Sequence, residues 1–199
     1  MRWNMYRFFI KRLIDLFLAI LVIPFVLIVF IPIYLAIKLE DRGSVIYSSS
    51  RLGVEMEEFA MYKFRSMMEN APDIRNSDGT TYNAVDDARV TKVGHFLRKT
   101  SLDELPQIFN VLKGDMSFIG PRPSPLGDKS IYPKDFFLKF KVRPGITGYS
   151  QAKVRNNATM PERIALDKHY VENYSLILDV KIIWWTIVSV LGHRNINRN

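Results

Sequence analysis

The sequence predicts an α+β fold that is mainly helical, with one short β-hairpin and an N-terminal helix–break–helix that re-enters a membrane. Three observations support this prediction. Residues 16–37 carry no charge, two short alternating segments flank a turn-prone stretch near residue 52, and residues 161–174 carry apolar side chains at helical spacing. We therefore divide the 199-residue chain into a membrane-associated segment, 1–40, and a larger domain, 41–199, with helices at the membrane interface.

The composition narrows the class of partner. Lys and Arg number 28 against 20 Asp and Glu, for a net charge of +8, which favours an anionic membrane, a phosphorylated substrate or nucleic acid. The aromatic residues lie in apolar runs instead of alternating with basic residues, so we expect no nucleic acid partner. The chain has no cysteine, which excludes disulfides and thiolate metal sites. P-loop, Gly-x-Ser-x-Gly and Asp-x-Asp motifs are also absent.

Residues 16–37 are long enough to cross a membrane, because a helix of that length extends about 33 Å against a hydrocarbon core of about 30 Å. A single spanning helix is therefore one interpretation. Two features favour a hairpin that enters and leaves by the same face. Pro24 lies near the expected bilayer midplane and favours a break there, and basic residues flank both ends of the run. The residues alone leave both topologies open.

The segments that follow indicate short mixed elements. Residues 44–48 and 59–64 are typical of two strands around the turn-prone "RLGVE", and 69–89 read as a long polar loop. Pro161 is suited to open a helix over about 161–174.

The last apolar stretch, 182–191, has only ten residues and is too short to span a membrane. We expect Asp179 to cap its start and Gly192 its end. Trp184 and Trp185 suit a membrane interface, although a buried core helix is equally compatible with this pattern. Its apolar face also leaves room for a homodimer.

Two neighbouring acids, Asp103 and Glu104, stand within "TSLDELPQIFNVLKGDMSFIGPRP" (100–123), just ahead of a short apolar helix pattern. Ser101 and Glu104 match a capping box, in which Glu104 only satisfies a backbone N–H. Alternatively, the helix begins at Pro106, and both acids lie ahead of its N-terminus and point in different directions. Both interpretations remain open from the sequence.

Phosphoryl-type transfer would give both acids a chemical role. It needs an oxygen nucleophile, a divalent cation and cationic groups that offset phosphate charge. Asp103 can be the nucleophile, and Glu104 can ligate a hard cation or transfer a proton. Arg122, between two prolines, can bind phosphate oxygens through both of its terminal nitrogens. Further positive charge comes from Lys63, Arg65, Arg98 and Lys99.

Three stretches carry a resemblance to a known family: "KFRSM", "RKTSLDELPQIFNVLKGDMSFIGPRP" and "RPGITGYSQ". They resemble the core of the monotopic bacterial phosphoglycosyl transferases, the bacterial sugar transferase family. The resemblance covers about residues 7–191. It implies an enzyme that moves a phosphosugar from a UDP-sugar to undecaprenyl phosphate and releases UMP, with Mg²⁺ assisting. Such a reaction is the first membrane step of capsule, O-antigen, exopolysaccharide or glycoprotein glycan assembly.

The resemblance also implies roles for individual residues. Asp103 would attack the β-phosphate and form a covalent intermediate, and Glu104 would assist the second half-reaction or the metal. The phosphate-handling positions of the family fall on Lys63 and Arg122, and its later arginine and aspartate fall on Arg155 and Asp167. The first apolar segment of the family is re-entrant, in agreement with the interpretation of Pro24.

We therefore expect a transferase of the bacterial inner membrane with its catalytic domain on the cytoplasmic face, since UDP-sugars are cytosolic. UDP-sugar, undecaprenyl phosphate and membrane lipids are its expected partners. Two alternatives stay open: a non-catalytic scaffold at the membrane surface whose acids only cap a helix, and a soluble nucleotide-sugar enzyme on a single-pass anchor. The sequence does not identify the sugar or the glycan pathway.

Overall fold

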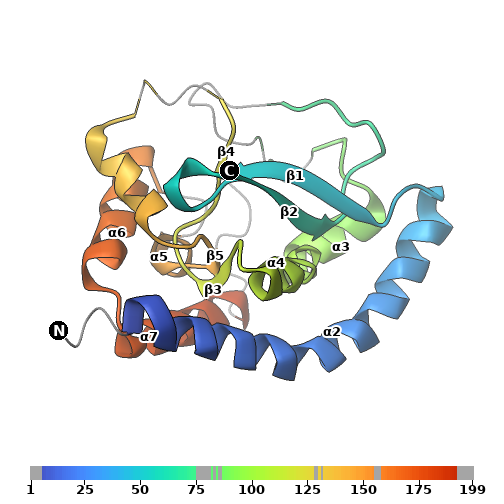
Figure 1. Cartoon of the computed structure of the whole chain (residues 1–199). Coiled ribbons are helices and arrows are strands. Elements are labelled where there is room, and N and C mark those ends of the chain that lie inside the picture. Colours follow the sequence, from blue (N-terminus) through green and yellow to red (C-terminus); the bar gives the residue numbers. More distant parts are fainter. Residues whose placement is uncertain are drawn as a thin grey trace.

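The computed structural model describes residues 6–74, 82, 84, 87–127, 130, 132–154 and 158–191. A short turn, η1 (Tyr6–Ile10), leads into one long helix, α2 (Lys11–Asp41), which curves along one side of the remaining elements (Figure 1). Helix α7 (Leu176–Leu191) lies near the N-terminal end of α2, and the smaller helices and strands sit above both. This arrangement is the α+β, mainly helical fold that the sequence predicts.

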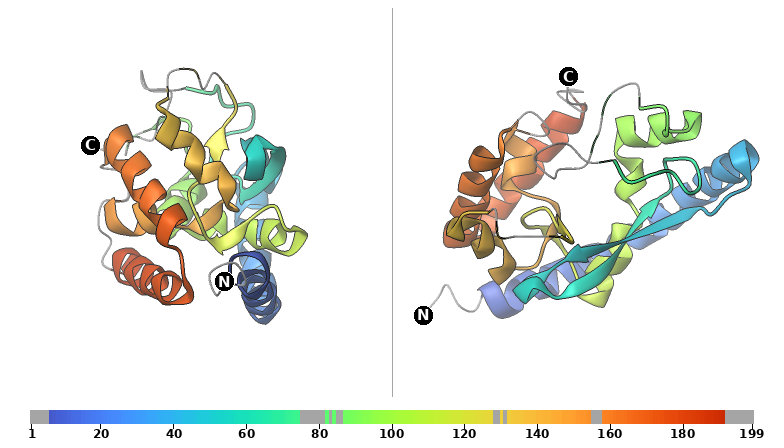
Figure 2. Two further views of the ribbon diagram at one scale, coloured as in Figure 1. Left: turned by 60° about the vertical axis from the view of Figure 1, so that its left-hand side comes forward. Right: turned by 90° about the horizontal axis from the view of Figure 1, so that it is seen from above.

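The predicted hairpin is present. Strands β1 (Ile46–Leu52) and β2 (Glu58–Phe64) pair antiparallel around the turn η2 (Val54–Met56), and β1 begins and ends later than the predicted 44–48. Strand β4 (Ser124–Pro125) adds to the other edge of β1, which gives the order β2-β1-β4, and no strand of the described residues pairs with the outer edge of β2. Figure 2 shows the hairpin running along α2.

The remaining elements connect this sheet to a second, parallel pair of strands that the sequence did not predict. They are, in chain order, α3 (Lys92–Thr100), η3 (Leu102–Glu104), α4 (Gln107–Lys113), β3 (Ser117–Ile119), η4 (Lys134–Lys141), β5 (Gly145–Thr147), α5 (Tyr149–Val154) and α6 (Met160–Asn173). Strands β3 and β5 form the parallel pair. Each has only three residues, too few for an alternating pattern to be recognised in the sequence.

Helix α2 corrects the predicted break at Pro24. The helix is continuous from Lys11 to Asp41, with both Pro24 and Pro32 inside it. A proline removes one backbone hydrogen bond, and a long helix can absorb that loss as curvature without dividing into two. Pro24 therefore does not separate two helices, and a re-entrant arrangement stays a prediction.

One face of α2 belongs to the core of the folded domain. Its buried side chains recur at helical spacing, and they pack against the hairpin, α3 and α4 in two hydrophobic clusters. The buried positions are Asp15, Ala19, Val26, Ile33 and Ile37. The opposite face exposes large apolar side chains such as Phe17, Phe25 and Ile28. A helix that is apolar on both its buried and its exposed face is typical of contact with lipid.

The C-terminal helices confirm one prediction and correct another. Helix α6 covers the predicted 161–174, and a capping box between Thr159 and Glu162 fixes its start. Helix α7 begins at Leu176 instead of after Asp179, because Ser175 accepts a hydrogen bond from the Leu178 N–H. Asp179 is thus buried inside the helix and does not cap it, and Gly192 lies outside the described residues.

Candidate active site

The two acids occupy a single turn between two helices. Helix α3 ends at Ser101, whose φ of 59° places it in the left-handed region, and η3 follows directly. Pro106 then precedes α4. The capping-box interpretation is wrong, since Ser101 makes no side-chain cap to the turn. The alternative, in which both acids lie ahead of the helix, is confirmed, although α4 begins at Gln107, one residue after the predicted start at Pro106.

Lys63 of β2 contacts both acids. Its Nζ lies 2.6 Å from Glu104 Oε1 and 3.5 Å from Asp103 Oδ2. Arg122 approaches Glu104 from the other side, with Nη1 3.5 Å from the same Oε1, while more than half of its side chain stays exposed. Strand β2, the turn η3 and the segment after β3 therefore bring together four of the predicted site residues, Lys63, Asp103, Glu104 and Arg122.

The two acids have opposite electrostatic environments. Burial raises the pKa of Asp103, and the charge of Glu104 raises it further, against the opposing effect of Lys63 and of Arg98. Burial acts on Glu104 in the same direction, but Lys63 and Arg122 together outweigh it and lower the pKa of Glu104 to about 2. The pair therefore consists of a fixed anion, Glu104, and a more basic carboxylate, Asp103, which is the better nucleophile.

Two further predicted cations, Arg98 and Arg65, line the same cleft as the acids but have different partners. Arg98, in the last turn of α3, donates from Nε to Ser66 Oγ at 2.9 Å, and its charge acts on Asp103. Arg65 is 6% exposed and donates from Nη1 to Asp41 Oδ2 at 2.6 Å. Arg65 thus fixes the C-terminal end of α2, and phosphate binding by this residue stays a prediction.

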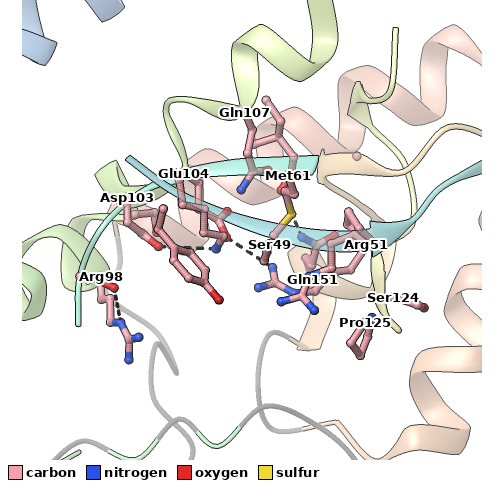
Figure 3. A pocket seen from close by; sticks show the side chains of 18 of the residues that line it. Ser49, Arg51, Met61, Arg98, Asp103, Glu104, Gln107, Ser124, Pro125 and Gln151 are labelled. Carbon is pink, nitrogen blue, oxygen red and sulfur yellow. Dashed lines mark hydrogen bonds and ion pairs between the residues drawn. The ribbon is translucent and has the colours of Figure 1, made fainter. Parts of the chain in front are cut away.

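A cleft of about 1830 Å³ connects the acids to other parts of the fold. One wall comes from the sheet. Strand β1 contributes Ser49 and Arg51, and strand β4 contributes Ser124 (Figure 3). Another part is lined by Val22 and Val26 of α2 together with Thr186 and Ser189 of α7. The cleft therefore extends from the acids to the two helices that carry exposed apolar faces.

Asp167 lines the same cleft from α6. Its carboxylate is buried, accepts a hydrogen bond from Ser150 Oγ at 2.7 Å, and lies 3.7 Å from Lys139 Nζ. Burial raises the pKa of Asp167, and Lys139 and Ser150 act in the opposite direction. Arg155, the other residue carried over with it, lies outside the described residues.

Comparisons with known proteins identify the family. A model described as bacterial sugar transferase matches residues 6–193, nearly the whole chain. The chain belongs to the bacterial sugar transferase family.

Its relatives include an exopolysaccharide production protein and transferases that are named for their substrates. This sugar transferase is 38% identical over 191 residues to the exopolysaccharide production protein ExoY of Sinorhizobium fredii, covering 90% of this chain and 84% of that protein. It is 39% identical to the UDP-glucose:undecaprenyl-phosphate glucose-1-phosphate transferase of Escherichia coli, covering 89% of this chain and 39% of that protein.

A third relative is the UDP-N-acetylgalactosamine-undecaprenyl-phosphate N-acetylgalactosaminephosphotransferase of Aeromonas hydrophila. The identity is 40%, over 92% of this chain and 44% of that protein. The chain thus spans less than half the length of these last two relatives, each of which is named for a UDP-sugar.

The acids of this sugar transferase fit a divalent cation by their chemistry. No cluster of three or more His, Asp or Glu side chains suited to a metal occurs within the described ranges. Mg²⁺ needs fewer protein ligands, since it takes one or two carboxylates and completes its shell with water and substrate phosphates. Asp103 and Glu104 provide two such carboxylates beside a cleft that is large enough for a diphosphate.

Several residues near the site were not predicted from the sequence. Lys139 and Ser150 surround Asp167, and Asn110 of α4 binds the backbone of β2. Their partners lie 17 to 50 residues away along the chain, so no local spacing reveals them. The only local signal was the position of Asn110 within "PQIFNVLKGD", on the same short helix that follows the acids.

Proposed function

We propose that this sugar transferase moves a sugar phosphate from a UDP-sugar to undecaprenyl phosphate in two steps. A carboxylate oxygen of Asp103 attacks the β-phosphorus, the bond from that phosphorus to the bridging oxygen breaks, and UMP leaves with the electron pair. An oxygen of undecaprenyl phosphate then attacks the same phosphorus, and the bond to Asp103 breaks. The product is a lipid diphosphate sugar, and Asp103 returns to its starting carboxylate.

The observation that carries this proposal is the unequal pair of acids beside several cations. The raised pKa of Asp103 reflects a carboxylate that burial makes more basic. Lys63 and Arg122 already hold the negative charge of Glu104, and the same two cations can take the charge that develops on a phosphoryl group. Half of the Arg122 side chain faces solvent and is accessible to such a group.

We propose Mg²⁺ as the cofactor, held by Asp103 and Glu104 together with the diphosphate. When bound, the ion neutralises phosphate charge and polarises the bonds to phosphorus. The residues of the chain supply the remaining functions: Asp103 attacks, Lys63 fixes the direction of Glu104, and Arg122 binds phosphate oxygens. The relatives named for UDP-sugars and undecaprenyl phosphate support both substrates.

The contacts of α2 support a membrane-embedded helix whose two ends stay on one face. By length and composition, α2 is long and apolar enough to cross a membrane. Its N-terminal end binds the domain through Lys11, whose Nζ lies 2.7 Å from Asp179 Oδ2. At its C-terminal end, Glu40 accepts a hydrogen bond of 2.7 Å from the Lys92 N–H at the start of α3. If α2 spanned the bilayer, these two contacts would lie on opposite faces of the membrane, although both of them join α2 to the same folded domain.

The exposed apolar faces of α2 and α7 support the same arrangement. Helix α7 exposes Ile177, Val180 and Trp184, and α2 exposes Phe17 and Phe25. Since the cleft reaches both helices, an acceptor embedded in the membrane could approach the acids without leaving the lipid. We propose the cytoplasmic face of the inner membrane, where UDP-sugars are available.

The intact mass of the detergent-purified protein tests the chemistry. Incubation with Mg²⁺ and a panel of UDP-sugars, without lipid acceptor, should add the mass of one phosphosugar. Asp103→Asn should abolish the adduct, whereas Glu172→Gln, at an exposed acid outside the described cleft lining, should leave it unchanged. If no donor gives an adduct and undecaprenyl phosphate releases no UMP, the proposed function is wrong.

Cysteine accessibility tests the topology. Phe9 and Leu39 are exposed residues near the two ends of α2, so cysteine is tolerated at each. In inverted and right-side-out vesicles, Phe9→Cys and Leu39→Cys should react with a membrane-impermeant maleimide from the same side. Labelling from opposite sides would show a spanning helix.

A further inference from the structure

Asn110 makes an uncommon set of contacts for a helical asparagine. It is fully buried in α4, and its side-chain amide binds the backbone of strand β2. Oδ1 accepts a hydrogen bond from the Tyr62 N–H at 3.0 Å, and Nδ2 donates to the Ala60 carbonyl at 2.7 Å. Nδ2 also donates to Asp115 Oδ2 at 3.2 Å. All the strong hydrogen-bonding groups of this amide except one lone pair are therefore engaged.

These contacts take the place of a missing strand. In the order β2-β1-β4, one edge of strand β2 pairs with no strand among the residues that the structure describes, and the backbone groups of alternate residues point outward there. An amide side chain carries one donor and one acceptor in the arrangement of a peptide group. Asn110 thus joins helix α4 to this edge by two backbone hydrogen bonds across about 50 residues of sequence.

The strand and the helix that Asn110 joins each carry part of the candidate active site. Lys63 follows Tyr62 directly in β2, and its Nζ reaches Glu104 at 2.6 Å. Glu104 lies in η3, which leads through Pro106 into α4. The hydrogen bonds of Asn110 therefore connect α4 to β2, and Lys63 connects β2 to the acids that precede α4.

We propose that Asn110 is a positioning residue. It fixes the position of strand β2 relative to helix α4 and so holds the Lys63 ammonium beside the carboxylates of Asp103 and Glu104. This role rests on the proposed function, because Lys63 matters to the rate only if the acids perform phosphoryl transfer. A lysine side chain has four rotatable bonds, so a shift of its strand changes how often its ammonium reaches the acids. A misplacement of about 1 Å can cost about 100-fold in rate.

Arg122 provides an internal control. It also contacts Glu104, but it does so from the segment between β3 and β4, and within the described part of the chain it is not bonded to Asn110 or to β2. If Asn110 acts through Lys63, its effect on the rate should depend on Lys63 and not on Arg122. A general loss of stability would affect both cations alike.

The first experiment is independent of catalysis. Hydrogen–deuterium exchange of peptides that contain the Tyr62 amide should be about tenfold faster in Asn110→Leu, because that N–H loses its acceptor. Asn173→Leu is the matched control, since Asn173 is exposed in α6 and donates only to the His169 carbonyl within its own helix. Unchanged exchange at the Tyr62 amide would show that Asn110 does not join α4 to β2.

The second experiment is a pair of double-mutant cycles on the rate of UMP release in the absence of acceptor. Asn110→Leu should lower this rate about 10- to 100-fold alone, and by less than about threefold when added to Lys63→Met. Added to Arg122→Met, it should keep its full effect. Equal effects in both backgrounds would overturn the positioning role.

A further variant covers the case in which Asn110→Leu does not fold. Asn110→Ala is smaller than the asparagine, adds no bulk or charge at the edge of β2, and removes both backbone hydrogen bonds. It should show the same loss of rate as Asn110→Leu, with the same dependence on Lys63. If the unaltered protein releases no UMP from any donor, the proposed function is wrong, and so is the positioning role of Asn110 in it. Hydrogen exchange would still show whether Asn110 joins α4 to β2.

Discussion

The buried carboxylates of Asp103 and Asp179 in this sugar transferase differ in how many hydrogen bonds they accept. Asp179 accepts hydrogen bonds from Tyr6, Lys11 and Tyr170 at 2.6 to 2.9 Å, and all three donors point at one carboxylate. Asp103 has Lys63 at 3.5 Å, beyond hydrogen-bond distance, and a second acid beside it. One acid is saturated by donors, and the other is buried without a close donor of its own among the described contacts.

This difference separates a structural acid from a reactive one. Saturated hydrogen bonds fix Asp179 and join the start of α2 to α6 and α7. Burial raises the pKa of Asp103 because its charge is less well compensated, and the lone pairs that stay available can attack phosphorus. The same residue type therefore holds the start of α2 in one place and, in the proposed function, acts as the nucleophile in the other.

The largest effect is expected at Asp103. Asp103→Asn removes the nucleophilic oxygen and should lower UMP release by more than about 1000-fold, or about 4 kcal/mol in activation free energy. The melting temperature should stay within about 2 °C, because the buried charge of Asp103 is poorly compensated in the folded protein. Single-turnover release of UMP and a thermal melt in detergent measure both. A variant that retains UMP release would place the nucleophile elsewhere.

The second effect is expected at Asp179, where stability should change instead of chemistry. Asp179→Asn removes the counter-charge of the largely buried Lys11 and should cost about 3 kcal/mol of unfolding free energy. The melting temperature should fall by roughly 6–12 °C, while UMP release at low temperature stays within about threefold. The control is Asp135→Asn, which removes an exposed ion pair to Lys168 and should change the melting temperature little. A loss of activity without a loss of stability would reverse the assignment of the two acids.

The third effect concerns the open side of the acid turn. Val22 and Ser189 line the cleft from α2 and α7, so Val22→Phe and Ser189→Phe should obstruct the acceptor. Transfer to undecaprenyl phosphate should fall about 10- to 30-fold, while the covalent adduct forms at its normal rate. Leu21→Phe and Val188→Phe change exposed neighbours on the same helices and serve as controls. Equal losses in both half-reactions would exclude this route.

The smallest effect is a pH dependence at the C-terminal end of α2. Hydrogen bonds from Arg65, against an opposing effect of burial, lower the pKa of Asp41 from 3.8 to about 2. A lowered pKa means that the ion pair stabilises the fold above about pH 4 and that this contribution disappears as the pH falls towards 2. Arg65→Met should therefore cost about 1–2 kcal/mol at pH 5, and the difference from the unaltered protein should close near pH 2. Thermal melts over that range measure it, and a constant difference would contradict the pair.

The elements predicted best were those with a local signal. The hairpin, the helix opened by Pro161 and the apolar helix over 16–37 each follow from turn residues or periodicity within one segment. The start of α7 was predicted wrongly, because Asp179 has the chemistry of a cap, while tertiary contacts with Lys11 and Tyr170 gave it a different role. The continuity of α2 through Pro24 was also missed, since propensity does not report how curvature distributes the lost hydrogen bond.

The sequence by itself determined the family, the pair of acids and the apolar helix, because each is a pattern of neighbouring residues. Only the tertiary structure decided the surroundings of each acid. Lys63 and Arg122 converge on Glu104 across 41 and 18 residues of chain, and Arg65 turns towards Asp41 at the end of α2. The physical reason is that a pKa, an ion pair and access to a cleft depend on burial and on partners brought from distant segments, which no local spacing encodes.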